Sequence, residues 1–186
     1  MSKLTKLRKL TVRVFRWKWN GAGLDEFSDQ AALGIASACP LEELTLSNCC
    51  CLTAATYSAF AARGTLRKLS LSIDSQSELD TFGTIAADPR RGAILSHGVE
   101  ICSIPSLQSV AFTIPLTAQA FVPMIGDAIG QYASWSVNES KSFLLCGIKD
   151  DAVVNFLKTA QQAEPAARIK VARGYGSSLP LMVSEW

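Results

Sequence analysis

The sequence feature that most constrains the fold is a short alternation of leucine with hydroxyl residues, which occurs twice. Residues 44–47 read Leu-Thr-Leu-Ser, and residues 69–72 read Leu-Ser-Leu-Ser. Because successive side chains of a strand point to opposite faces of a sheet, this pattern predicts two strands with one apolar face and one polar face. The central strands of a doubly wound sheet are covered on both faces and are apolar throughout, so the alternation favours a sheet with one open face.

Four further segments are predicted to join the same sheet. They are residues 7–15, residues 105–112, residues 142–148, whose register is left open, and the segment around Ile169 and Val171. Equivalent positions lie 25 residues apart from Leu44 to Leu69 but 41 apart from Leu69 to Val110. The connections between the strands are therefore expected to differ in length.

Helices are predicted in these connections. Ser28-Asp29 and Thr53 are typical of helix N-caps, whose side-chain oxygens accept hydrogen bonds from the first backbone N–H groups of a helix. Gly64 is expected to end the helix that begins after Thr53. Further helices are expected after Ser77, Thr117 and Asp150-Asp151, and residues 88–104 are expected to be an irregular insertion with a short helix or an extra strand.

The segment from position 39 to position 53 has a recognisable order of residue types. A cysteine, three leucines, a second cysteine and Leu-Thr follow one another at Cys39, Leu41, Leu44, Leu46, Cys49, Leu52 and Thr53. Residues 146–150 resemble the end of the same motif, with Lys149 in place of threonine. This order resembles the cysteine-containing subtype of the ribonuclease-inhibitor-like leucine-rich repeats.

The resemblance implies an α/β fold, a leucine-rich-repeat solenoid with parallel strands on its concave face and helices on its convex face. About five to six irregular repeats would form one short horseshoe over residues 1–186, since a single repeat cannot bury its own apolar face. Because the first predicted strand begins close to Met1, the domain is also expected to be a piece of a longer array of repeats.

In the family that the chain resembles, the concave face binds protein partners. The subtype is often joined to an F-box and serves as the substrate receptor of a ubiquitin ligase, although no F-box-like helical segment precedes residue 7. The resemblance therefore implies a non-catalytic protein-interaction module, with substrate recognition in a ubiquitin ligase as one role.

The alternation also assigns the residues that face a partner, because they lie between the apolar positions of each strand. The predicted partner-binding residues are Lys9, Thr11, Arg13, Glu43, Thr45, Ser47, Lys68, Ser70, Ser72, Ser109, Thr113, Arg168 and Lys170. The middle of this surface is small and hydroxylic and its ends are basic. Such a surface favours contact with a protein through hydrogen bonds and charge, without the aromatic residues typical of binding hot spots.

Basic residues concentrate at the start of the chain. Seven lie in the first 18 positions, without an acid among them, although the net charge of the whole chain is only +2. A solvated edge of the first repeat accounts for this charge. Nucleic-acid binding, with Trp17 and Trp19 as stacking platforms, is the less favoured alternative.

Motifs of catalysis and of metal or cofactor binding are not apparent. Cys49-Cys50-Cys51 has neither a second ligand pair nor more than one histidine, His97, to complete a zinc site. Residues 20–23 follow a strand as a phosphate-binding loop would, but Glu26 stands where the third glycine belongs. We therefore predict no catalytic, cofactor-binding or metal-binding residues and no enzyme activity, while a compact doubly wound α/β enzyme of unknown reaction remains the alternative.

The expected location is inside the cell, in the cytoplasm or the nucleus. No apolar run approaches the roughly 20 residues that span a bilayer, so no membrane association is expected. The N-terminus also lacks the apolar region of a secretory signal. The six cysteines are accordingly expected to be reduced thiols rather than disulfides.

Overall fold

The computed structural model consists of one β-sheet with helices packed against it. It describes residues 5–14, 27–47, 49, 52–72, 97–113, 129–138, 140–148, 151–173 and 183–185. The strands are β1 (Lys9–Arg13), β2 (Glu43–Ser47), β3 (Lys68–Ser72), β4 (Ser109–Thr113), β5 (Ser142–Ile148), β6 (Ile169–Arg173) and β7 (Val183–Glu185). The helices are α1 (Asp29–Ala38), α2 (Ala54–Arg63), α4 (Gly98–Cys102) and α6 (Asp151–Ala163), and residues 129–136 are also helical.

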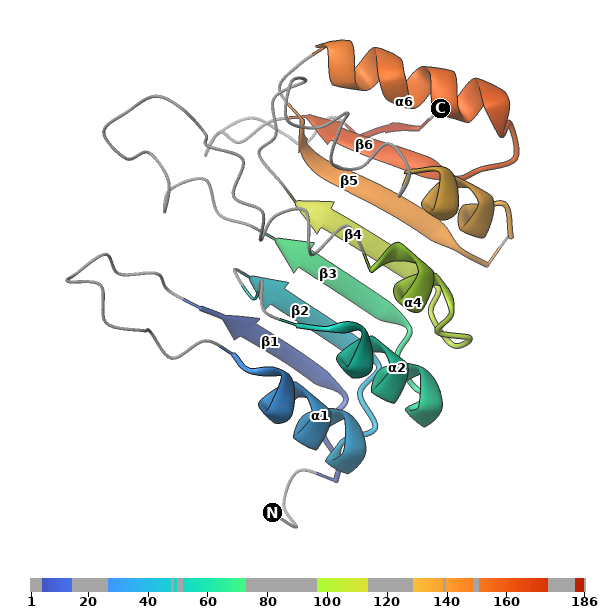
Figure 1. Ribbon diagram of the computed structural model, residues 1–186. Coiled ribbons are helices and arrows are strands. Elements are labelled where there is room, and N and C mark those ends of the chain that lie inside the picture. The colour runs from blue at the N-terminus through green and yellow to red at the C-terminus, as the bar shows by residue number, and fades with distance from the viewer. Residues whose placement is uncertain are drawn as a thin grey trace, which may run out of the picture.

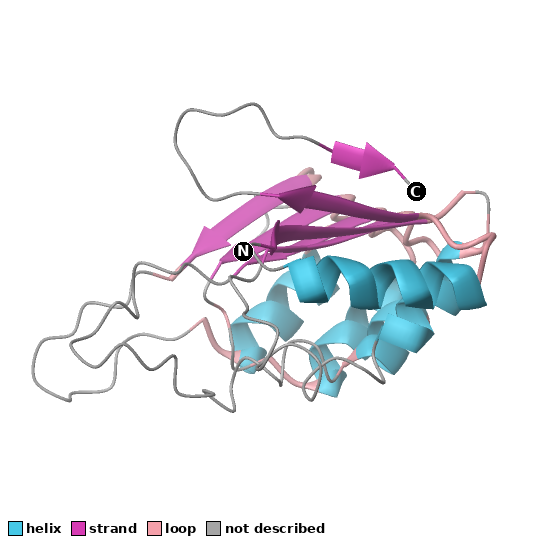
Figure 2. Cartoon of the chain, turned by 90° about the horizontal axis from the view of Figure 1, so that it is seen from above, coloured by secondary structure: helices cyan, strands magenta, loops and turns pink. Residues whose placement is uncertain are grey.

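The strands follow one another across the sheet in the order of the chain (Figure 1). β1 to β6 are parallel, and β7 pairs with β6 in the antiparallel direction. All the described helices lie on the same face of this sheet (Figure 2). The predicted α/β class and the predicted parallel sheet are therefore confirmed.

The register of the strands follows the apolar spacing of the sequence. One row of directly paired residues runs through Leu10, Leu44, Leu69, Val110, Phe143 and Ile169. A second row runs through Val12, Leu46, Leu71, Phe112, Leu145 and Val171. From β2 onward both rows are buried, whereas Leu10 and Val12 are half-buried because β1 is at the edge of the sheet. The predicted inward position of the leucines of β2 and β3 is confirmed.

The helices complete the core on the same side of the sheet. Tyr132, from the helix at 129–136, stacks on Phe143 of β5 with ring centroids 4.8 Å apart. Both rings meet Phe112 of β4 edge to face, at 5.2 and 5.8 Å. Such aromatic pairs contribute about 0.5–1.5 kcal/mol beyond the area they bury, so this cluster fixes the helix over the middle of the sheet.

Three predicted helix boundaries are confirmed. The Ser28 hydroxyl accepts a hydrogen bond from the N–H of Ala31 at the start of α1, and the Thr53 hydroxyl accepts one from the N–H of Ala55 at the start of α2. Gly64 ends α2 in the left-handed conformation, with φ at 67°. An L-residue adopts that conformation only at a cost, which explains the glycine.

The described part of the segment 88–104, for which a short helix or an extra strand is expected, contains a short helix, α4. One element differs from the expectation. The tail of the chain contributes a strand, β7, that was not predicted, because three residues are too few to define a period. Several features singled out in the sequence lie outside the described residues. They are the helix expected after Ser77, the caps at Thr117 and Asp150, Trp17, Trp19, residues 20–23 and the cysteines at 50 and 51.

Candidate interaction face

The face of the sheet opposite the described helices presents three rows of side chains from β1 to β6. We call this surface the open face (Figure 2). Its first row is Lys9, Glu43, Lys68, Ser109 and Ser142; its middle row is Thr11, Thr45, Ser70, Ala111, Leu144 and Lys170; its last row is Arg13, Ser47, Ser72, Thr113 and Cys146. Apart from Ser47, these residues are exposed or half-buried. The register thus brings together predicted residues that lie far apart in the sequence.

Two of the predicted residues differ from the rest of the open face. Ser47 is only 3% exposed. Its hydroxyl accepts a hydrogen bond from that of Ser72 at 2.7 Å, and its carbonyl accepts one from the backbone N–H of Val14. Arg168 precedes β6 and is exposed, and its backbone N–H donates to the carbonyl and the hydroxyl of Ser136. Ser72 is therefore the more accessible member of the serine pair.

A cluster of charges occupies the first row. The ammonium groups of Lys9 and Lys68 lie 3.1 and 3.3 Å from the same oxygen of Glu43, which stands between them on β2. Hydrogen bonds from these two lysines hold the pKa of Glu43 below its ordinary value. The carboxylate therefore stays ionised and holds two lysines from different strands in neighbouring positions, leaving the trio with one positive charge.

The middle row changes character along the sheet. It is hydroxylic at Thr45 and Ser70 and becomes apolar at Ala111 and Leu144, all of them half-buried. Sequence reasoning missed Leu144, because residues 143–146 read Phe-Leu-Leu-Cys and no alternation separates inward from outward positions. Only the pairing of β5 with β4 shows that Leu144 stands beside Ala111 on the open face.

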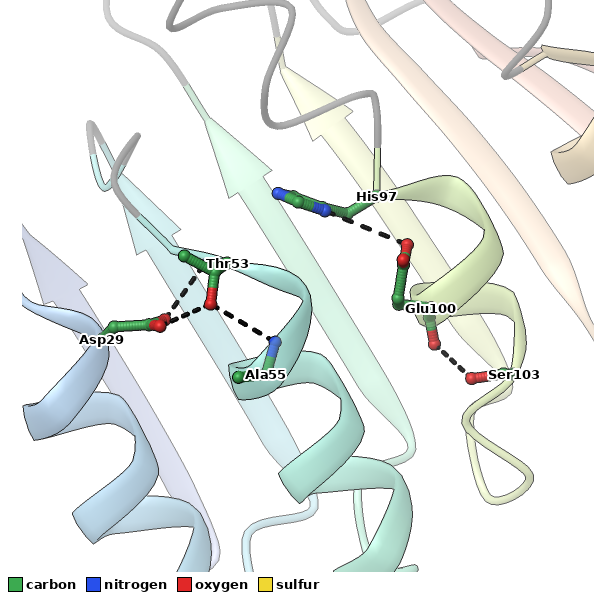
Figure 3. Close-up of polar contacts among 6 residues, drawn as sticks. All are labelled: Asp29, Thr53, Ala55, His97, Glu100 and Ser103. Carbon is green, nitrogen blue, oxygen red and sulfur yellow. Dashed lines mark hydrogen bonds and ion pairs between the residues drawn. The ribbon is translucent and has the colours of Figure 1, made fainter.

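A second polar cluster lies on the helical side of the sheet (Figure 3). The carboxylate of Asp29 accepts hydrogen bonds from the backbone N–H and the hydroxyl of Thr53 and from the hydroxyl of Thr56. Burial would raise the pKa of Asp29, but these hydrogen bonds outweigh it and lower the pKa. The arrangement joins the starts of α1 and α2.

His97 lies at the start of α4, close to this cluster. Its Nδ1 is 3.9 Å from a carboxylate oxygen of Glu100 (Figure 3). Its ring centroid is 5.3 Å from that of Tyr57. Among the described residues, no group of three or more histidine, cysteine, aspartate or glutamate side chains is arranged to bind a metal ion.

The described cysteines, Cys39, Cys49, Cys102 and Cys146, form no disulfide. Burial raises the pKa of the Cys102 thiol to about 12, and a nearby lysine, Lys141, offsets only part of this effect. Burial also raises the pKa of Cys146, although a hydrogen bond with Thr113 acts against it. Since the thiolate is the reactive form, Cys102 and Cys146 are suited to packing rather than to nucleophilic chemistry.

Comparisons with known proteins found no relative for the chain. No family model matches it, and neither a curated protein nor a solved structure is significantly similar. Within the described part of the chain, none of the helices combines the length and the apolar character required to cross a lipid bilayer.

Proposed function

We propose that this chain is a short leucine-rich-repeat solenoid that acts as a non-catalytic protein-interaction module and binds its partner on the open face. The observation that carries the proposal is the open face itself. Charged and hydroxyl side chains from successive parallel strands stand in register there, on the side of the sheet away from the described helices.

Support for repeats comes from contacts that recur from one strand to the next. The Thr65 hydroxyl donates to the carbonyl of Leu41, and the Ser106 hydroxyl donates to the carbonyl of Leu66, both at 2.8 Å. Thr65 directly precedes the buried Leu66, and Ser106 directly precedes the buried Leu107. Each leucine lies three positions before an inward-facing residue of the strand that follows, Leu69 or Val110. Equivalent positions therefore make equivalent contacts, as stacked repeats require.

The topology favours a solenoid over the doubly wound enzyme fold. A doubly wound sheet reverses its strand order at the binding crevice and carries helices on both faces. Here the strands lie in chain order from β1 to β7, and the described helices lie on one face. Among the described strands there is no reversal of order of the kind at which such enzymes bind their ligands, and this supports the proposed non-catalytic role without a cofactor.

Protein is a better candidate than nucleic acid for the partner. Two basic side chains at the start of the chain already face acids, since Lys9 pairs with Glu43 and Arg8 lies 3.7 Å from Glu42. These ion pairs offset part of the positive charge on which affinity for nucleic-acid phosphates depends. The proposal extends, as in the family that the chain resembles, to an intracellular role in substrate recognition by a ubiquitin ligase.

Affinity capture from a native cell lysate tests the binding face. The wild-type chain is compared with a Thr45→Arg/Ser70→Arg variant, which places two bulky charges in the middle row. The matched control is Gln30→Arg/Ser58→Arg, which adds the same charges at exposed positions of α1 and α2. Specific partners should be recovered with the wild type and the control and lost with the open-face variant.

Circular dichroism establishes that both variants are folded before the capture is compared. Equal recovery of every specific partner by all three proteins would show that the open face is not the binding surface.

A further inference from the structure

The charge and apolar pattern of the open face fits one kind of protein segment. We propose that the open face binds an extended acidic segment of a protein partner. One carboxylate of the segment would lie on the Lys9–Glu43–Lys68 trio and one apolar side chain on Ala111 and Leu144. This inference rests on the proposed function and specifies the chemistry of the partner.

The lysine trio supplies the site for the carboxylate. Both lysine side chains are largely exposed, at 71% and 63%, while each makes its ion pair with Glu43. Because one carboxylate cannot neutralise two ammonium groups, an acidic group from outside is attracted to the trio. Glu43 limits this attraction but holds both lysines in place, which lowers the entropy lost when they bind a further carboxylate.

The balance of charge in the trio sets the sign of this end of the face. Lys9 and Lys68 carry two positive charges against the single negative charge of Glu43. Charge complementarity accordingly favours an acidic partner over a basic or neutral one.

The apolar contact lies farther along the sheet. Ala111 and Leu144 are paired neighbours on β4 and β5, and Leu144 keeps part of its side chain accessible. Between them and the trio lie Thr45 and Ser70, whose short side chains allow a partner backbone to approach and can exchange hydrogen bonds with it. A segment that crosses the strands would thus meet charge first, then hydroxyls, then an apolar surface.

The distance between the two contacts sets the spacing in the partner. Neighbouring strands are about 4.8 Å apart and a strand rises about 3.3 Å per residue. From Glu43 to the midpoint of Ala111 and Leu144 is therefore about 14 Å, which an extended segment covers in about four residues. Since side chains two or four positions apart point the same way in an extended chain, an acidic and an apolar residue four positions apart would reach both contacts.

Selection from a displayed library of random peptides about 12 residues long tests this inference on the full chain. The enriched peptides should carry aspartate or glutamate four positions from a large apolar residue. Lys9→Glu/Lys68→Glu should lower their affinity at least tenfold, and Leu144→Ser should weaken the preference for the apolar residue. Raising the salt concentration should weaken binding to the wild type, because exposed charges are screened.

The control matches the change in charge at exposed positions of the helices. Arg63→Glu/Gln30→Glu/Gln162→Glu makes the chain equally more negative and should leave peptide affinity unchanged. If Lys9→Glu/Lys68→Glu fails to fold, Lys9→Gln/Lys68→Gln removes the attraction without adding repulsion from Glu43 and should lower affinity in the same direction.

The outcomes separate this inference from the proposed function. Peptides that bind the Thr45→Arg/Ser70→Arg variant as well as the wild type contradict the open face as a binding site. If the enriched peptides lose binding to that variant but are basic or neutral, the open face remains a binding site and only the proposal of an acidic partner is wrong. The proposal of an acidic partner is also wrong if the selection enriches no acidic peptide. It is equally wrong if a single-stranded oligonucleotide displaces the enriched peptides and binds more tightly through Lys9 and Lys68.

Discussion

Asp29, the first residue of α1, accepts a hydrogen bond of 2.9 Å from the backbone N–H of Thr53, the N-cap of α2 (Figure 3). The same carboxylate accepts hydrogen bonds from the hydroxyls of Thr53 and Thr56, and Thr56 is fully buried. Helix N-termini attract negative charge through their free N–H groups. One carboxylate therefore stabilises the starts of two helices and links consecutive strand–helix units.

Removing this carboxylate should destabilise the fold. We expect Asp29→Ala to lower the free energy of unfolding by about 1–3 kcal/mol, because it leaves the buried Thr56 hydroxyl without its acceptor. Urea denaturation followed by circular dichroism measures the change. Adding Thr56→Val should recover part of the loss, since replacing both partners removes the unpaired polar group.

Glu164→Ala is the control, because it removes a carboxylate at an exposed position near the end of α6. Its effect should stay within about 0.5 kcal/mol, as for most surface substitutions. A comparable loss in both variants would show that the link between the helices contributes nothing specific.

The contribution of Asp29 should depend on pH. Its pKa in the folded chain lies below the ordinary value of 3.8, because the hydrogen bonds from Thr53 and Thr56 outweigh the effect of burial. A lowered folded-state pKa stabilises the fold above the unfolded pKa and loses that effect as the pH falls through the folded pKa. The stability difference between the wild type and Asp29→Asn should therefore be constant near neutral pH and shrink below about pH 3.8. A difference that grows on acidification would contradict this assignment.

The two lysines beside Glu43 should be visible in its titration. Replacing Lys9 or Lys68 by methionine should raise the pKa of Glu43 toward its ordinary value of 4.5, and the double variant should raise it further. Carbon-detected NMR of the side-chain carboxyl measures this pKa directly. Added salt should raise it in the wild type more than in the double variant, since screening weakens only the ion pairs that are present. An unchanged pKa would mean that the lysines do not share the carboxylate in solution.

Two glycines should respond to alanine in opposite directions. Gly64 has a φ of 67°, so Gly64→Ala should cost about 1 kcal/mol or more through backbone strain. Gly34 lies within α1, and a β-carbon added there would meet no atom within 4 Å. Gly34→Ala should therefore stabilise the chain by about 0.4–1 kcal/mol. For a chain of this size these changes correspond to roughly 2–4 °C in Tm per kcal/mol, which calorimetry resolves. Two shifts of the same sign would contradict this account of both sites.

Cys102 should resist alkylation in the folded chain. With its pKa raised to about 12, the fraction of thiolate near pH 8 is roughly a thousandfold smaller than for a thiol with the ordinary value of 9.0. Labelling with iodoacetamide, followed by mass spectrometry of the peptide that contains Cys102, measures the rate. The rate should rise sharply in guanidinium chloride, where the thiol regains its ordinary pKa. Equal rates in the folded and unfolded chain would show that the thiol is not held in a buried site.

The sequence by itself determined strands β2 and β3 and several ends of the helices. Leu44, Leu46, Leu69 and Leu71 repeat with a period of two, so a slip of one residue between the strands would move the whole set to the other face. Ser28, Thr53 and Gly64 act on the backbone within three or four residues, so their roles follow from local chemistry. Information of this kind is contained in a short window of the chain.

The tertiary structure decided what depends on contacts between distant segments. Leu144 joined the open face only through pairing with Ala111 across 33 residues, and Asp29 became an acceptor for Thr53 only when two helices stacked. The same holds for Lys9 and Lys68, which meet at Glu43 because three strands align. Such contacts depend on strand register and helix packing, to which every strand and helix contributes. A local pattern of residue types therefore does not predict them.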